Sequence, residues 1–156
     1  MNSGRLPRIL VIDDEIFIRS LLEDFFTKSG YEVTIAHNGK SGIAEICHKQ
    51  FDVVLVDLKM PDKNGTEVLA EIRSIDAKLP VVIMTGYPTT EAASEAKRLG
   101  AHDLVMKPFR LSDLKECIGR AINSRAAAQQ ANEQRTRTEP VQTELLHAET
   151  ASPAHV

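Results

Sequence analysis

The chain has 156 residues, of which 42% are hydrophobic and 26% charged, and its formal net charge is −3. This length corresponds to about one domain of roughly 100–200 residues, with the composition of an ordinary globular protein. The small negative charge gives no electrostatic reason to expect nucleic acid or a membrane surface as a partner. No apolar stretch approaches the roughly 20 residues that span a bilayer. Residues 1–8 also lack the apolar core of a signal peptide, so we expect a cytoplasmic protein.

Short apolar runs recur along the chain and predict strands. Four of them, Ile9–Ile12, Val53–Val56, Val81–Met84 and Leu104–Met106, are apolar at consecutive positions. Such runs are typical of parallel strands that are buried on both faces. A fifth segment, Tyr31–Ala36, alternates apolar and polar residues instead, which indicates a strand with one less buried face at the edge of a sheet.

Between these runs, apolar residues recur at helical spacing. Gly30 is placed to end the first helix, because glycine readily adopts the left-handed conformation found after helices. Five helices are predicted. The second covers Lys40–His48 and the fourth covers Glu91–Leu99. The apolar residues of the other three are Ile18, Leu21, Leu22, Phe25 and Phe26 in the first, Val68, Leu69 and Ile72 in the third, and Leu111, Leu114, Ile118 and Ile122 in the fifth. Strands that alternate with helices predict an α/β fold with a parallel sheet. Cys47 and Cys117 lie in helical segments without metal-ligand spacing, so we expect both to be buried or half-buried free thiols.

Four of the apolar runs end at a polar residue. Asp13 and Asp14 follow the first run, Asp57 the second, Thr85 the third and Lys107 the fourth. Ligands of open parallel sheets bind beyond the carboxyl ends of the strands. If the runs are neighbouring strands, three carboxylates, a hydroxyl and an ammonium group therefore meet at one edge of the sheet.

These residue types suit phosphoryl transfer to an aspartate. The Asp57 carboxylate is a candidate nucleophile that can form an acyl phosphate. Its two acidic neighbours need a compensating cation, and Mg²⁺ fits carboxylate ligands best. Thr85 can donate its hydroxyl to one phosphoryl oxygen, and Lys107 can place a compact positive charge against another.

Each of these residues also has an ordinary interpretation. Asp13 or Asp14 could cap the helix that begins near Glu15, and Asp57 could be a turn residue of the Pro- and Gly-rich loop that follows it. Thr85 could belong to a turn, and Lys107 could be an exposed lysine. Their joint occurrence at four strand ends favours the functional interpretation.

The two ends of the chain differ in composition from residues 8–123, which we predict to form the domain. We expect residues 1–7 to be a flexible N-terminus. Residues 124–156 are expected to extend the last helix and then to form a disordered tail, because large apolar side chains become rare beyond Arg135. About 30 residues are too few for a DNA-binding module.

The order and spacing of these residues resemble the response regulator receiver domain of two-component signalling, of the single-domain type found in chemotaxis. The resemblance covers roughly Arg8–Asn123. Its motifs are Asp13-Asp14, Asp57 with Met60-Pro61 and Gly65, Thr85-Gly86, Gly100-Ala101 and Lys107-Pro108-Phe109. It implies a doubly wound, flavodoxin-like fold with a five-stranded parallel sheet in the order 2-1-3-4-5.

The resemblance also implies a role for each site residue. Asp14, Asp57 and the backbone carbonyl of Lys59 would ligate Mg²⁺ directly, and Asp13 would act through a bound water. The Lys107–Pro108 peptide bond would be cis and aim the ammonium group at the site. The protein would not be a conventional turnover enzyme, but it would undergo Mg²⁺-dependent self-phosphorylation and autodephosphorylation at Asp57.

The implied partners are proteins. None of the five histidines lies in a plausible relay with the acidic cluster, so the phosphoryl group would come from a histidine kinase or a histidine phosphotransfer protein. The output would be binding to a downstream protein through Glu91–Leu99, Asp103–Met106 and Leu111–Ile122. A phosphorelay intermediate and a phosphorylation-independent adaptor remain alternatives. A phosphorylation-dependent homodimer also stays open.

Two departures from the common receiver pattern stand out. Leu104 occupies the switch position that acts together with Thr85, where such domains usually carry an aromatic residue. We therefore expect weaker coupling to the surface. Lys59 and Tyr87 flank the path of attacking water, and this bulky pair could shield an acyl phosphate.

Overall fold

The computed structural model describes residues 4–127 of the chain. Its strands are β1 (Arg8–Ile12), β2 (Glu32–Ala36), β3 (Val53–Asp57), β4 (Val81–Thr85) and β5 (Asp103–Met106). All neighbouring strands pair in parallel, and the sheet has the order β2-β1-β3-β4-β5. The predicted fold class and strand order are therefore confirmed.

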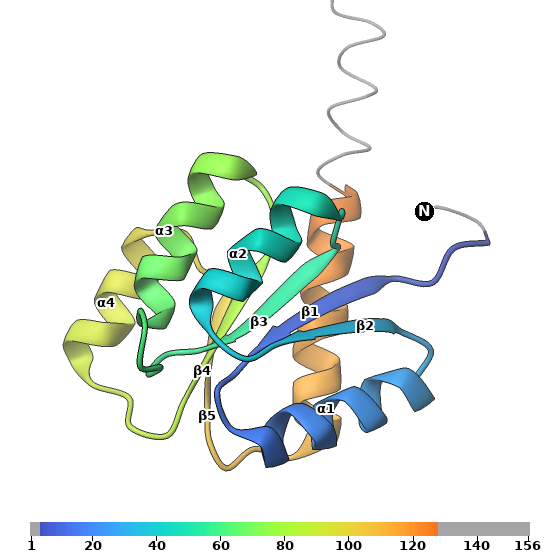
Figure 1. Cartoon of the computed structure of the whole chain (residues 1–156), viewed down its shortest axis with the longest axis horizontal. Helices are drawn as coiled ribbons and strands as arrows, with labels where there is room; N and C mark the ends of the chain where they lie inside the picture. Colours follow the sequence, from blue (N-terminus) through green and yellow to red (C-terminus); the bar gives the residue numbers. More distant parts are fainter. Residues whose placement is uncertain (1–3, 128–156) are drawn as a thin grey trace, which may run out of the picture. The chain divides into compact units, whose positions relative to one another are not determined.

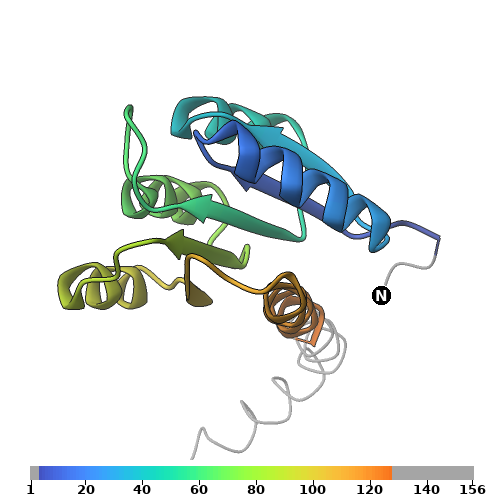
Figure 2. The ribbon, with the colours of Figure 1, turned by 90° about the horizontal axis from the view of Figure 1, so that it is seen from below.

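Helices cover both faces of the sheet. They are α1 (Ile16–Lys28), α2 (Gly39–His48), α3 (Gly65–Ile75), α4 (Thr90–Arg98) and a last helix that is described over residues 111–127. α1 and the last helix pack on one face, and α2, α3 and α4 pack on the other (Figure 1). Figure 2 shows the same arrangement from below, with the sheet between the two groups of helices.

The three central strands β1, β3 and β4 are apolar apart from Arg8 at the start of β1 and the terminal residues Asp57 and Thr85, because each face of the sheet meets a helical layer. Ile9 and Val11 of β1 belong to the cluster under α1 and the last helix, whereas Leu10 and Ile12 belong to the cluster under α2, α3 and α4. All four side chains are fully buried. Alternate residues of one strand thus fill two different cores, which is the arrangement that a consecutive apolar run indicates.

The edge strands are less buried, as the alternating pattern of β2 predicted. In β2, Glu32 is exposed and Val33 is half-buried, although Ile35 on the apolar side of the pattern is also exposed. The expectation of burial on both faces was wrong for β5, where Met106 is 58% exposed, because β5 is the other edge strand. α2 and α4 begin one residue earlier than predicted, since Asn38 and Thr89 cap them with their side chains, and α4 also ends one residue earlier, at Arg98. The expectation that both cysteines are buried or half-buried was wrong for Cys47, which is exposed on α2, and right for Cys117, which is buried.

The predicted ends of the domain can be compared only in part with the structure. The sheet begins at Arg8, and the last helix continues at least to residue 127. The predicted disordered tail lies outside the described residues. Among the helices of residues 4–127, none combines the length and the apolar character needed to cross a bilayer.

Candidate phosphoacceptor and metal site

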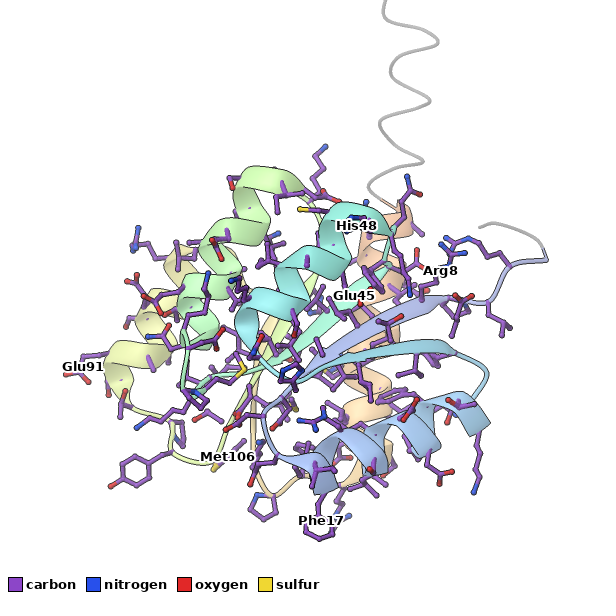
Figure 3. All side chains as sticks on the ribbon, viewed as in Figure 1. Arg8, Phe17, Glu45, His48, Glu91 and Met106 are labelled. Atoms are coloured by element: carbon purple, nitrogen blue, oxygen red, sulfur yellow. The ribbon has the colours of Figure 1, made fainter. Side chains whose placement is uncertain are left out.

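The polar residues selected from the sequence lie at one end of the sheet. Asp13 comes directly after β1, Asp57 ends β3, Thr85 ends β4 and Lys107 comes directly after β5. The parallel register makes these positions neighbours, because Ile12 pairs with Val56 and Asp57 with Met84. In Figure 3, the labelled side chains of Met106 and Phe17 lie at this end, whereas Arg8 and His48 lie at the other.

Three carboxylates form the acidic part of the site. Oxygens of Asp13, Asp14 and Asp57 all lie within 4.8 Å of one another. The Asp13 side chain is fully buried and Asp57 is only 7% exposed, while Asp14 is open to solvent. The site therefore has a buried floor and one accessible carboxylate.

Lys107 supplies positive charge to this cluster. Its Nζ lies 3.0 Å from Asp13 Oδ2, 3.1 Å from Glu15 Oε1 and 3.3 Å from Asp57 Oδ1. The Lys107–Pro108 peptide bond is cis. The Lys107 backbone N–H also donates to the Thr85 carbonyl at 2.7 Å, which ties the residue to the end of β4.

The ionisation of the cluster reflects burial and like charge. Burial and the nearby Asp13 carboxylate raise the pKa of Asp57 to about 6, although Lys107 acts in the opposite direction. Burial also raises the pKa of Asp13, against the hydrogen bonds from the Glu15 backbone and from Lys107. Burial works against the Lys107 ammonium, but its carboxylate partners outweigh this effect and raise its pKa. One ammonium group does not neutralise the acids around it.

This donor set fits a hard divalent cation. Closely spaced carboxylates in a site that is partly open to water are the arrangement in which Mg²⁺ is bound while it keeps several of its own waters. A divalent cation would also relieve the repulsion that raises the pKa of Asp57. Asp13, Asp14 and Asp57 are the residues whose side chains could hold it.

Of the ordinary interpretations, the turn at Thr85 is observed, but neither Asp13 nor Asp14 caps α1, whose N-cap residue is Glu15. Asp13 Oδ1 accepts a hydrogen bond from the Glu15 backbone N–H at 2.8 Å. Thr85 Oγ1 accepts one from the Tyr87 backbone N–H at 3.0 Å. Neither interaction occupies the whole functional group, since the second Asp13 oxygen, Oδ2, contacts Lys107 and the Thr85 hydroxyl keeps its proton to donate.

The loop after β3 folds back closely on the site. The Gly65 N–H donates to the Leu58 carbonyl at 2.7 Å, and a Cβ atom at position 65 would lie 2.8 Å from the Asp57 carbonyl oxygen. Only glycine fits there without displacing the loop. Lys59 is exposed in this loop, and its Nζ lies 6.0 Å from the ring centre of Tyr87. The two side chains thus approach each other from different loops.

Leu104 lies away from the carboxylates, on the neighbouring edge strand. It pairs with Ile83 of β4 and packs, partly buried, against the core cluster under α2, α3 and α4. Ala92 and Leu99 at the two ends of α4 pack against the same cluster. The residue therefore connects the middle of β4 with the α4 side of the molecule.

Two residues of the site were not selected from the sequence. Glu15 contacts Lys107, and the Arg19 guanidinium donates to the Asp13 carbonyl at 2.8 Å from the first turns of α1. The position of Glu15 directly after two aspartates at a strand end could have suggested its role. Arg19 gave no comparable indication, because its partner is a backbone atom.

Comparison with known proteins agrees with this geometry. Residues 9–119 match the family model described as the response regulator receiver domain. The regulatory protein AtoC of Escherichia coli is 40% identical over 117 residues, which are 75% of this chain and 25% of that protein. Sporulation initiation phosphotransferase F of Bacillus subtilis is 35% identical over 111 residues, which cover 71% of this chain and 90% of that protein. The chain thus spans about a quarter of the length of several curated relatives and nearly the whole of others.

Solved structures give the same result. A CheY-like receiver domain protein from Methanospirillum hungatei superposes with a TM-score of 0.78 at 31% identity, over 80% of this chain and 99% of that one. The response regulator TrrA of Thermotoga maritima, solved in complex with Mg²⁺ and BeF, gives a TM-score of 0.69 at 32% identity, over 74% of this chain and 99% of that one.

Proposed function

This chain belongs to the response regulator receiver domain family, and we propose that it accepts a phosphoryl group on Asp57 with the help of Mg²⁺. The observation that carries the proposal is the position of Asp57, which is buried at the carboxyl end of β3, close to Asp13 and Asp14, and within 3.3 Å of the Lys107 ammonium.

The proposed step is a displacement at phosphorus. A carboxylate oxygen of Asp57 forms a bond to the phosphorus atom of a phosphohistidine, and the bond between phosphorus and the imidazole nitrogen breaks. The electron pair of that bond stays on the imidazole. Burial and the charge of Asp13 raise the pKa of Asp57 to about 6, so a higher pH or a bound cation favours the ionised form that attacks phosphorus.

Neighbouring residues position the charges that this step needs. Lys107 can turn one of its three N–H groups from a carboxylate to a phosphoryl oxygen, and Thr85 can donate its hydroxyl proton to another. Asp14 and Asp57 would hold the cation directly with the Lys59 carbonyl, and Asp13 would act through water. The bound cation would neutralise the charge that develops on the phosphoryl oxygens.

The partners that fit this function are proteins. A histidine kinase or a histidine phosphotransfer protein would supply the phosphoryl group in the cytoplasm. The phosphoryl group carries about −1.5 to −2 charge at neutral pH, in place of the single charge of the Asp57 carboxylate. The altered surface would then bind a downstream protein or a second copy of the chain.

The proposal is tested by phosphorylation in vitro. The purified protein is incubated with Mg²⁺ and a small-molecule phosphodonor, and its intact mass is measured. We expect the gain of one phosphoryl group in the wild type and no gain in Asp57→Asn. Asp52→Asn is a matched control, because Asp52 lies at the opposite end of β3 and its carboxylate accepts from the Arg8 backbone. A phosphoryl gain in Asp57→Asn equal to that of the wild type would refute the assignment.

A role as phosphorelay intermediate is a second candidate. It is favoured by the match over 90% of the length of sporulation initiation phosphotransferase F, whose name describes a phosphotransferase. The phosphorylated protein would in that case return its phosphoryl group to a histidine. Incubation of the phosphoprotein with the histidine phosphotransfer proteins of the source organism distinguishes the two roles, because a terminal regulator loses the group only to water.

A further inference from the structure

The loop between β3 and α3 is fastened to the first turn of α2 by Asp62. Both carboxylate oxygens of Asp62 take part, since Oδ1 accepts from the Gly39 N–H at 3.1 Å and Oδ2 accepts from the Lys40 N–H at 2.9 Å. A residue of one loop thus bonds to the beginning of a helix that is more than twenty positions away in the sequence.

These two hydrogen bonds complete the N-terminus of α2. The first N–H groups of a helix have no partner within the helix. Asn38 accepts from the Ser41 N–H through its side chain and from the Gly42 N–H through its carbonyl. The N–H groups of Gly39 and Lys40 are left, and Asp62 accepts from both. The helix is therefore capped jointly by its own Asn38 and by the distant loop.

Lys63 adds a second contact between the same segments. The aliphatic part of its side chain lies so close to Gly39 that a Cβ atom there would be 2.5 Å from Lys63 Cγ. Its Nζ lies 2.7 Å from Glu71 Oε1 on α3. We use the name clasp for Asp62, Lys63 and the first turn of α2 at Gly39 and Lys40.

The clasp lies beside the proposed metal site. Asp14 lines the same surface pocket as Pro61 and Asp62, together with Arg19, His37 and Asn38. The loop is fixed at its two ends by β3 and by the Gly65–Leu58 hydrogen bond, but Lys59 between them is exposed. The clasp is thus the contact that joins the middle of this loop to the neighbouring helix.

We propose that the clasp makes Asp62 a positioning residue, which holds the loop so that the Lys59 carbonyl is in place for the divalent cation. Asp62 is not a ligand in this proposal. Fixing the loop before binding avoids part of the entropy cost of ordering it around the cation. The inference rests on the proposed function, because it assumes that the cation binds at Asp14, Asp57 and Lys59.

The test compares two neutral replacements of Asp62. Asp62→Asn and Asp62→Ala remove the same charge, but the Asn side chain keeps one acceptor for the α2 N–H groups and Ala keeps none. Because Asp62 is exposed, neither change leaves a cavity. The dissociation constant for Mg²⁺ is measured by NMR titration of the full chain, with Asp52→Ala as a control at the far end of β3.

We expect Asp62→Ala to raise the dissociation constant for Mg²⁺ by roughly threefold to tenfold. Replacing a residue that orients a metal ligand typically lowers metal affinity by roughly tenfold or more, so this effect is a small one of that kind. Asp62→Asn should lose clearly less Mg²⁺ affinity, and Asp52→Ala should bind Mg²⁺ as tightly as the wild type. In metal-free protein, the Gly39, Lys40 and Gly65 amides should exchange faster in Asp62→Ala, which reports loop opening without any cation.

The outcomes separate the two proposals. A wild type that binds no Mg²⁺ overturns the proposed function and this inference with it. If the wild type binds and the Asn and Ala variants are weakened equally, only the charge of Asp62 matters and the clasp proposal is wrong. Unchanged affinity in both variants, or unchanged amide exchange in Asp62→Ala, also overturns it while the proposed function stands.

Discussion

Lys107 Nζ lies 3.3 Å from Asp57 Oδ1, and the same nitrogen contacts carboxylate oxygens of Asp13 and Glu15 at 3.0 and 3.1 Å. Three carboxylates therefore share one ammonium group, while Asp14 adds a further negative charge nearby. The site carries a surplus of negative charge, and part of it is buried. This surplus costs folding free energy in the absence of a cation, and it favours binding of one.

This cost predicts that Asp57→Asn stabilises the metal-free protein at neutral pH. Burial and the nearby Asp13 carboxylate raise the pKa of Asp57 to about 6 in the folded protein, against an ordinary value of 3.8. Between these values the folded state keeps a proton that the unfolded state releases, so wild-type stability falls as pH rises through this window. Asn carries no such charge, so the free energy of unfolding of Asp57→Asn should exceed that of the wild type by at most about 3 kcal/mol above pH 6.

Urea denaturation of both proteins in EDTA, from about pH 4 to pH 8, measures this difference. The advantage of Asp57→Asn should grow with pH and then level off. An advantage that is constant across the range would show that ionisation of Asp57 is not its cause. In saturating Mg²⁺ the difference should shrink, because the cation stabilises the wild type.

Removing charge from the cluster should weaken cation binding. Asp13→Asn and Asp14→Asn each take away one carboxylate, and we expect the dissociation constant for Mg²⁺ to rise at least about tenfold. The fold should survive, since both residues lie beyond the end of β1. Asp24→Asn serves as a control, because Asp24 is exposed on α1 and pairs with Lys28. The affinities are measured by titration with Mg²⁺ and NMR shifts. Wild-type affinity in both site variants would exclude these residues as ligands.

The sequence predicted the central strands and the residues at their ends because both depend on a pattern along the chain. A strand such as Val53–Asp57 is apolar at each position before its last residue, and the parallel arrangement then carries Asp57 to the same edge as Asp13. The one-residue shifts at helix starts came from capping side chains such as Asn38.

The partners of Glu15 and Asp62 do not follow from such a pattern, although the position of Glu15 beside two aspartates could have suggested that it belongs to the site. Each contact joins segments far apart in the sequence, Glu15 with Lys107 and Asp62 with α2, and each depends on the path of a loop rather than on a periodic pattern. The exposure of Cys47 escaped prediction for a related reason. The apolar face of α2 is narrow, and neighbouring Ile46 occupies it.

The lifetime of the acyl phosphate should depend on Tyr87. This side chain is 72% exposed and approaches the Lys59 ammonium over the loops that border Asp57. If the pair screens the phosphorus from water, Tyr87→Ala should speed hydrolysis severalfold, because water reaches the phosphorus more easily. Tyr87→Phe keeps the ring and should decay like the wild type. Loss of phosphoprotein mass after removal of the donor gives both rates, and equal or slower decay in Tyr87→Ala would contradict a shielding role.

The response of the surface to phosphorylation should pass through Leu104. A phosphoryl group on Asp57 can act at a distance only by favouring one of two arrangements of the molecule. We expect Thr85 to move toward the phosphoryl group and Leu104 to enter the space that it leaves. Leu104 already packs beside the core residues that support α4. Because leucine has neither a ring nor a hydroxyl group, the change at the surface should be smaller than in receivers with an aromatic residue there.

Amide shifts with and without beryllofluoride, a stable phosphoryl mimic, measure this response. They should extend from the site to α4, β5 and the last helix, and they should be larger in Leu104→Tyr, whose ring needs more room in the new position. Val105→Ile is a control, because Val105 packs against the opposite core cluster. Shifts confined to the loops around Asp14, Asp57 and Lys107, or equal shifts in wild type and Leu104→Tyr, would mean that the switch does not run through this side chain.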